Sequence, residues 1–248
     1  MLSFDEEAKG IYLPGALITV ASLIPEAKDA SDEYAHFAAL RASDHSPDTA
    51  VLALYDLKNS SEPFVSSDKA DINAVKEVFD KLNRDFGGGF IMAVRDRVYS
   101  PTESEYTGFE RKRGAIRALV KLLTDGENGF SLLYGDTGAL REKKYILALD
   151  SDTELSFETL HRLKCIACHP LNTPVFDPKE RRITAGYGCI APRSETSLSS
   201  SCKTLFSTLF TAGGAAAYAP AVSERYMDMF STSLFTGKGL IDVNAYAR

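Results

Sequence analysis

Short runs of apolar residues alternate with amphipathic segments along most of this chain. Four runs rich in Val, Ile, Leu or Ala predict buried strands over 16–24, 50–55, 90–94 and 145–149. Apolar residues at helical spacing predict helices over 26–42, from Ser67 onward, and over 111–123. Strands separated by helices predict an α/β fold of the Rossmann-like kind, with a mostly parallel sheet flanked by helices. We expect one domain over 1–248.

Composition and charge narrow the classes of partner. The chain has 248 residues, 44% hydrophobic and 25% charged, which suits one sizeable α/β domain. A formal net charge of −6 argues against nucleic acid as a partner. The apolar stretch 13–25 is too short to span a bilayer and lacks the basic flank of a signal peptide. Taken alone, the chain is expected to be soluble and cytoplasmic.

The four cysteines, at positions 165, 168, 189 and 202, are candidate ligands of a cofactor or metal. The run C-I-A-C-H at 165–169 matches a c-type haem attachment pattern, but haem attachment needs export and no export signal is present. The four positions do not form the two close pairs of a structural zinc site. The stretch 157–168 is instead interpreted as a helix in which the cysteines are small buried residues.

Two carboxylates follow the last of the four apolar runs. The sequence Y-I-L-A-L-D-S-D-T-E at 145–154 places Asp150 and Asp152 one residue apart, and Asp56 ends the second run. In parallel sheets ligands bind beyond the carboxyl ends of the strands. Mg²⁺ and Mn²⁺ are often held by one or two carboxylates together with substrate phosphates. The pattern therefore predicts a divalent metal at Asp150 and Asp152. The alternative is an ordinary loop, because Asp is common after strands.

Three basic residues open the helix predicted over 111–123: Arg111, Lys112 and Arg113. Cations at a helix N-terminus oppose the helix dipole, so helix stability does not explain them. An anionic ligand would, because N-terminal amides and basic side chains both bind phosphate. The alternative is a solvated basic surface.

Several motifs, in order, resemble the glycosyltransferase domain of cyclic β-1,2-glucan synthases (glycosyltransferase family 84). They are F-E-R-K-R-G-A-I (109–116), L-D-S-D-T (149–153), H-P-L-N-T-P (169–174), G-Y-G-C-I-A-P-R (186–193) and F-T-G-K-G-L-I-D-V (235–243). The resemblance covers roughly 109–246. It implies a GT-A-like fold and inverting transfer of glucose from UDP-glucose, with Mg²⁺ or Mn²⁺, to a β-1,2-glucan acceptor.

The resemblance also implies roles for particular residues. Asp150 and Asp152 match the D-x-D motif that holds the metal and the UDP diphosphate. The basic-glycine element corresponds to Arg111, Lys112 and Gly114. Because Gly114 has no side chain, the backbone can approach the ligand there. Two further residues contact the donor or acceptor: Asp56, placed against the uracil, and Lys238, within the F-T-G-K-G stretch that lines the sugar or acceptor site.

Other family elements have no counterpart in this sequence. In the family a carboxylate base and a Trp-containing segment follow the F-T-G-K-G motif, whereas this chain ends at Arg248 and contains no Trp. We therefore expect a C-terminally truncated domain of a larger synthase at the cytoplasmic face of the inner membrane, with the other domains of that synthase as partners and no assigned catalytic residue. The alternatives are a non-catalytic nucleotide-sugar-binding fragment or assembly module, and a nucleotidyltransferase, whose usual Gly-rich loop is absent from 21–30.

Overall fold

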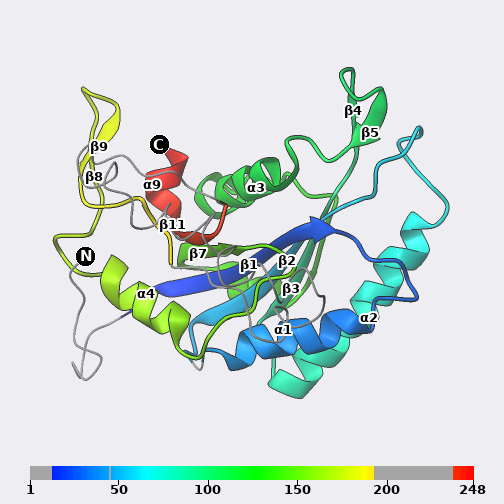
Figure 1. Ribbon diagram of the computed structural model, residues 1–248, viewed down its shortest axis with the longest axis horizontal. Helices are drawn as coiled ribbons and strands as arrows, with labels where there is room; N and C mark the ends of the chain where they lie inside the picture. Colours follow the sequence, from blue (N-terminus) through cyan, green and yellow to red (C-terminus); the bar gives the residue numbers. More distant parts are fainter. Residues whose placement is uncertain (1–12, 45, 193–236) are drawn as a thin grey trace, which may run out of the picture.

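The computed structural model describes residues 13–44, 46–192 and 237–248, and its centre is a seven-stranded sheet (Figure 1). The strand order is β10-β11-β7-β1-β2-β3-β6. Neighbours among β7, β1, β2 and β3 are parallel, whereas β6, β11 and β10 run antiparallel to their neighbours. The predicted mostly parallel α/β sheet is confirmed. The strands are β1 (Gly15–Leu23), β2 (Thr49–Asp56), β3 (Phe90–Arg95), β6 (Leu132–Gly135), β7 (Lys143–Leu149), β10 (Cys189–Ile190) and β11 (Gly239–Asp242).

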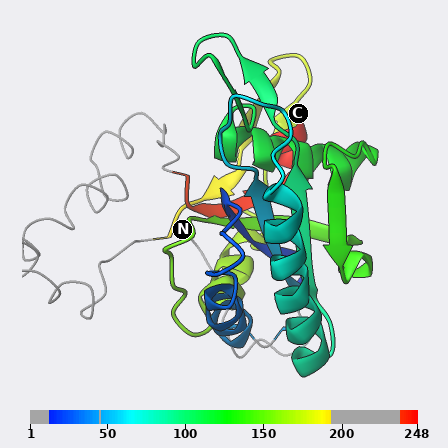
Figure 2. The same cartoon turned by 90° about the vertical axis from the view of Figure 1, so that its right-hand side faces the viewer.

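Helices cover both faces of this sheet. The bounds are α1 (Asp32–Ala42), α2 (Asp68–Phe86) and α4 (Thr159–Ala167) on one face, and α3 (Arg111–Asp125) and α9 (Val243–Ala247) on the other. Figure 2 shows the two layers from the side, with α3 above the sheet and α1 below it. A single-turn helix, η1 (Thr137–Leu140), connects β6 to β7. Within the described ranges, no helix is both long and apolar enough to cross a membrane.

Two hydrophobic clusters explain why the central strands are apolar over most of their length. Alternate residues of β1 point to opposite faces, so Ile18 packs toward α1, α2 and α4 while Leu17 packs toward α3 and α9. All eight residues of β2 are buried, as expected for a strand covered on both sides. The helices contribute one face each, for example Phe79 of α2 and Leu119 of α3.

Two predicted helices begin later than expected. The segment predicted as helix over 26–42 is helical only from Asp32, and the backbone N–H of Ala27 donates instead to the Asp71 carboxylate of α2 at 2.8 Å. The segment predicted over 157–168 is helical from Thr159, because Glu158 has a positive φ, which a right-handed helix does not allow. The N–H of Glu158 donates to the Ser43 carbonyl at 2.8 Å.

Several short strands were not predicted. Two hairpins stand outside the main sheet: β4 (Val98–Ser100) with β5 (Glu105–Thr107), and β8 (Val175–Asp177) with β9 (Arg182–Ala185). The antiparallel edge strand β6 was also missed. The short strands expected after 183 are present as β10 and β11, whereas 193–236 lies outside the described residues.

The strand order has a topological switch point beside β1. From β1 the chain moves outward through β2, β3 and β6, and then returns to the other side of β1 to form β7. Connections therefore leave the carboxyl ends of β1 and β7 in opposite directions, and ligands of open α/β sheets bind at such a point. The same edge carries the β4–β5 hairpin (Figure 1).

Candidate functional site

The carboxyl edge of the sheet brings together residues that are far apart in the sequence. Asp56 is the last residue of β2, and Asp150 directly follows β7. Lys112 lies in the first turn of α3, whose start is at the same edge, and Lys238 directly precedes β11. The structure therefore brings four predicted ligand-binding residues to the carboxyl edge of the sheet.

Asp150 is the centre of this group. Its Oδ1 accepts a hydrogen bond from Lys112 Nζ at 2.5 Å, and its Oδ2 lies 3.2 Å from Lys238 Nζ. Partial burial by itself would raise the pKa of Asp150, but the hydrogen bonds and charges of Lys112 and Lys238 outweigh burial and hold the pKa below its ordinary value. Asp150 is therefore a carboxylate at neutral pH, with one ammonium group on each oxygen.

Asp152 is more open. Its side chain is 84% exposed, and Lys238 Nζ lies 3.9 Å from its Oδ1. The Lys238 ammonium therefore lies within ion-pair distance of both carboxylates, a position that suits a cation. Among the residues described here, no group of three or more His, Cys, Asp or Glu side chains could hold a metal ion. The two aspartates fit a hard divalent cation in ligand type, provided that substrate phosphates complete its shell.

Asp56 is held by a buried arginine that the sequence analysis missed. Arg95, the last residue of β3, donates from Nε and Nη2 to the two oxygens of Asp56 at 2.7 and 2.8 Å. It also donates to the carbonyls of Phe109 and Arg111 at 3.1 and 2.8 Å. Arg95 thereby ties the end of β2 to the segment that leads into α3. Its only sequence signal is a charge at the end of the apolar run F-I-M-A-V-R.

A cavity of about 170 Å³ lies between the ends of β1 and β2 and the start of α3. Asp56, Gly108, Arg111 and Lys112 are among the residues that line it. A Cβ at Gly108 would lie 2.3 Å from Oδ2 of Asp56, so only glycine allows the backbone to pass this carboxylate. The structure thus brings Asp56 and Lys112 to one cavity.

The three basic residues at the start of α3 take different directions. Lys112 turns to Asp150, as described above. Arg111 pairs with Glu103 at 3.2 Å and Arg113 lies 3.8 Å from Glu110, and both arginine side chains are more than half exposed. Only Lys112 therefore contacts an aspartate of the site, while Arg111 lines the cavity from its rim.

Two glycines lie near Lys112, Gly114 in the sequence and Gly237 in space. A Cβ at Gly114 would lie 2.0 Å from the carbonyl oxygen of Phe109, so this glycine is required by the packing of the preceding loop. The ligand contact expected for Gly114 remains a prediction. Gly237 has a φ of +87°, and a Cβ there would lie 3.9 Å from Lys112 Nζ. Of the F-T-G-K-G stretch, Gly237 to Gly239 belong to the described residues, and 235–236 lie outside them.

The three described cysteines, Cys165, Cys168 and Cys189, take no part in this site. Cys165 is buried in α4, as the helical interpretation expects, and Cys168 caps the same helix. Burial raises the pKa of Cys189 to about 12, which keeps it a thiol. None of these three forms a disulfide, and Cys202 lies outside the described residues.

Comparison with known proteins supplies a relative. No protein-family model matches the chain. Over 159 residues, 63% of its length, the chain is 35% identical to the cyclic β-(1,2)-glucan synthase NdvB of Rhizobium meliloti (strain 1021). It contains a glucan-synthase-related region. The match spans only 6% of the length of that relative.

Proposed function

We propose that this domain is the UDP-glucose-binding part of an inverting, metal-dependent glucosyltransferase with a GT-A-type fold, acting in β-(1,2)-glucan synthesis. One observation carries the proposal: Lys112 and Lys238 converge on Asp150 at the carboxyl end of β7. The similarity to a cyclic β-(1,2)-glucan synthase supports the assignment to β-(1,2)-glucan synthesis.

The two lysines suit a diphosphate. Each ammonium group now pairs with Asp150, and each would exchange that partner for a phosphate oxygen when the donor binds. Asp150 and Asp152 would then hold a divalent metal, which supplies Lewis-acid stabilisation of the departing diphosphate. The two aspartates would thus provide metal ligands, and the two lysines would provide cations for the diphosphate.

Asp56 suits the nucleoside. Each of its oxygens accepts one hydrogen bond from Arg95, and a carboxylate has about four lone-pair sites. It can therefore accept an N–H of a base while Arg95 keeps it in place. Inversion also needs a general base for the acceptor hydroxyl, which we leave unassigned. Location at the cytoplasmic face of the inner membrane stays a prediction.

Calorimetric titration tests the donor site. We expect UDP and UDP-glucose to bind in the presence of Mn²⁺ and to bind much more weakly after EDTA is added. Asp150→Ala and Asp152→Ala should remove this metal dependence. Asp125→Ala is a matched control, because Asp125 is exposed at the far end of α3. Unchanged metal-dependent binding in both site variants would refute the assignment.

A further inference from the structure

A second, larger cavity borders the cavity beside Asp56, on the side of the β4–β5 hairpin. Its volume is about 480 Å³, within the range of roughly 300–1,000 Å³ typical of ligand pockets. It is lined by β4, by the turn of the hairpin and by 107–111. Thr107, Gly108 and Arg111 line both this cavity and the smaller one beside Asp56. A ligand in the larger cavity would therefore lie next to the proposed donor.

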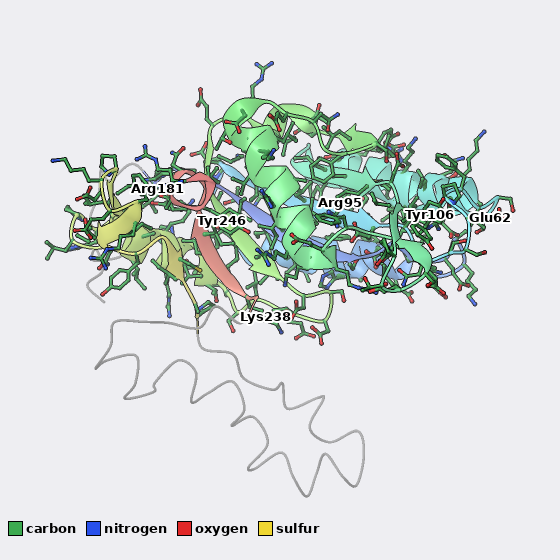
Figure 3. The ribbon with its side chains drawn as sticks, turned by 90° about the horizontal axis from the view of Figure 1, so that it is seen from above. Glu62, Arg95, Tyr106, Arg181, Lys238 and Tyr246 are labelled. Atoms are coloured by element: carbon green, nitrogen blue, oxygen red, sulfur yellow. The ribbon has the colours of Figure 1, made fainter. Side chains whose placement is uncertain are left out.

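Exposed aromatic rings form part of its wall. Phe109 is 61% exposed and Tyr99 is 51% exposed, and both line the cavity. Tyr99 is held edge-on against Tyr106, with ring centroids 5.3 Å apart. Figure 3 shows Tyr106 at the same end of the molecule as Glu62, whereas Tyr246 lies toward the other end. Large apolar groups left in water around a hollow are typical of a binding surface.

The hairpin is anchored rather than free. Tyr106 and Ser60 exchange backbone hydrogen bonds of 2.8 and 3.1 Å, and the Thr107 hydroxyl donates to Asn59 Oδ1 at 2.8 Å. Three of the six described non-glycine residues with positive φ lie in or beside this wall: Ser104, Glu110 and Arg111. Strained backbone of this kind tends to gather at functional sites, where it fixes side chains in place.

The charges in the cavity favour a neutral, hydroxyl-rich ligand. Its charged lining residues are Glu103, Glu110 and Arg111, with a net formal charge of −1, so the lining gives an anionic ligand no net attraction. Arg111 and Glu103 pair at 3.2 Å, which presents donors and acceptors side by side. Apolar ring faces beside such a pair suit a sugar, which has apolar C–H faces and hydroxyl edges.

We infer that the cavity between the β4–β5 hairpin and the start of α3 is a subsite for a neutral glucan chain, with Tyr99 and Phe109 as its stacking surfaces. This inference rests on the proposed function for the identity of the sugar. The subsite holds the glucan next to the smaller cavity beside Asp56, with which it shares Thr107, Gly108 and Arg111.

A linear β-(1,2)-gluco-oligosaccharide is the probe, followed by saturation-transfer NMR and calorimetry on the full chain. We expect Tyr99→Ala and Phe109→Ala each to weaken its binding about tenfold or more. Tyr99→Phe, which keeps the ring, and Tyr246→Ala, which removes an exposed tyrosine elsewhere, should bind as the unmodified chain does.

UDP titration of the same samples separates this inference from the proposed function. The inference is supported if oligosaccharide binding falls in both alanine variants while UDP binding is unchanged. It is overturned if the unmodified chain binds no oligosaccharide, if both alanine variants bind it normally, or if they lose UDP and keep the oligosaccharide. Oligosaccharide binding without any UDP binding would refute the donor site and leave the glucan subsite standing.

Discussion

Substitution of Arg95 by Met should destabilise the fold severely. The Arg95 and Asp56 side chains are each 9% exposed, so Arg95→Met leaves a nearly buried carboxylate without its cation. Removal of one partner of a buried ion pair costs about 3–5 kcal/mol. The carbonyls of Phe109 and Arg111 lose a donor as well. For a domain of this size each kcal/mol lowers Tm by about 2–4 °C, so we expect a fall of roughly 6–20 °C.

Urea unfolding of a double-mutant cycle measures the pair directly. Asp56→Leu in the Arg95→Met background removes the orphaned charge, so the double variant should regain about 2 kcal/mol or more relative to Arg95→Met alone. Arg113→Met is the control and should change the free energy of unfolding by less than about 0.5 kcal/mol, because that side chain is 76% exposed. The reasoning fails if Arg95→Met unfolds within about 1 kcal/mol of the unmodified chain, or if the two substitutions are simply additive.

Two further predictions concern backbone packing and pH. Gly114→Ala should lower the free energy of unfolding in urea by about 1–3 kcal/mol, because the new Cβ would lie 2.0 Å from the Phe109 carbonyl oxygen. Gly138→Ala is the control, because a Cβ there has its nearest contact at 3.4 Å. Equal losses of stability in the two variants would contradict the steric argument. Hydrogen bonds from Arg97 lower the pKa of Asp68 below 3.8. The resulting stabilisation is complete above the pKa of Asp68 in the unfolded chain, and it is lost as the pH falls through the pKa in the folded chain. The free energy of unfolding, measured from pH 6 to pH 3, should therefore fall less steeply in Asp68→Asn than in the unmodified chain. Identical slopes of this free energy against pH would refute the role of the Asp68–Arg97 pair.

The central sheet could be predicted because each of its parallel strands contains a run rich in apolar residues. A strand covered by helices on both faces is mostly apolar, and each of the four parallel strands contains such an apolar run. The edge strand β6 is only four residues long and half buried, so it leaves no comparable pattern. The β4–β5 hairpin is largely exposed, and its position depends on pairing with Ser60 of a distant loop.

The site was predictable in its residue types and less so in its partners. Asp150 and Lys112 stood out because charges next to apolar or helical runs need an explanation. The pairing of Asp56 with Arg95 joins residues 39 apart, and no local pattern encodes that contact. The divergence of Arg111 and Arg113 from Lys112 also depends on tertiary partners, namely Glu103 and Glu110.

The pairing of β11 with β7 has a consequence for the site. Leu240 and Ile241 of β11 lie opposite Leu147 and Ile146 of β7, and they pack into the clusters on opposite faces of the sheet. A slip of one residue would exchange the faces to which Leu240 and Ile241 point. Burial of these two apolar side chains therefore fixes the register that holds Lys238 beside Asp150.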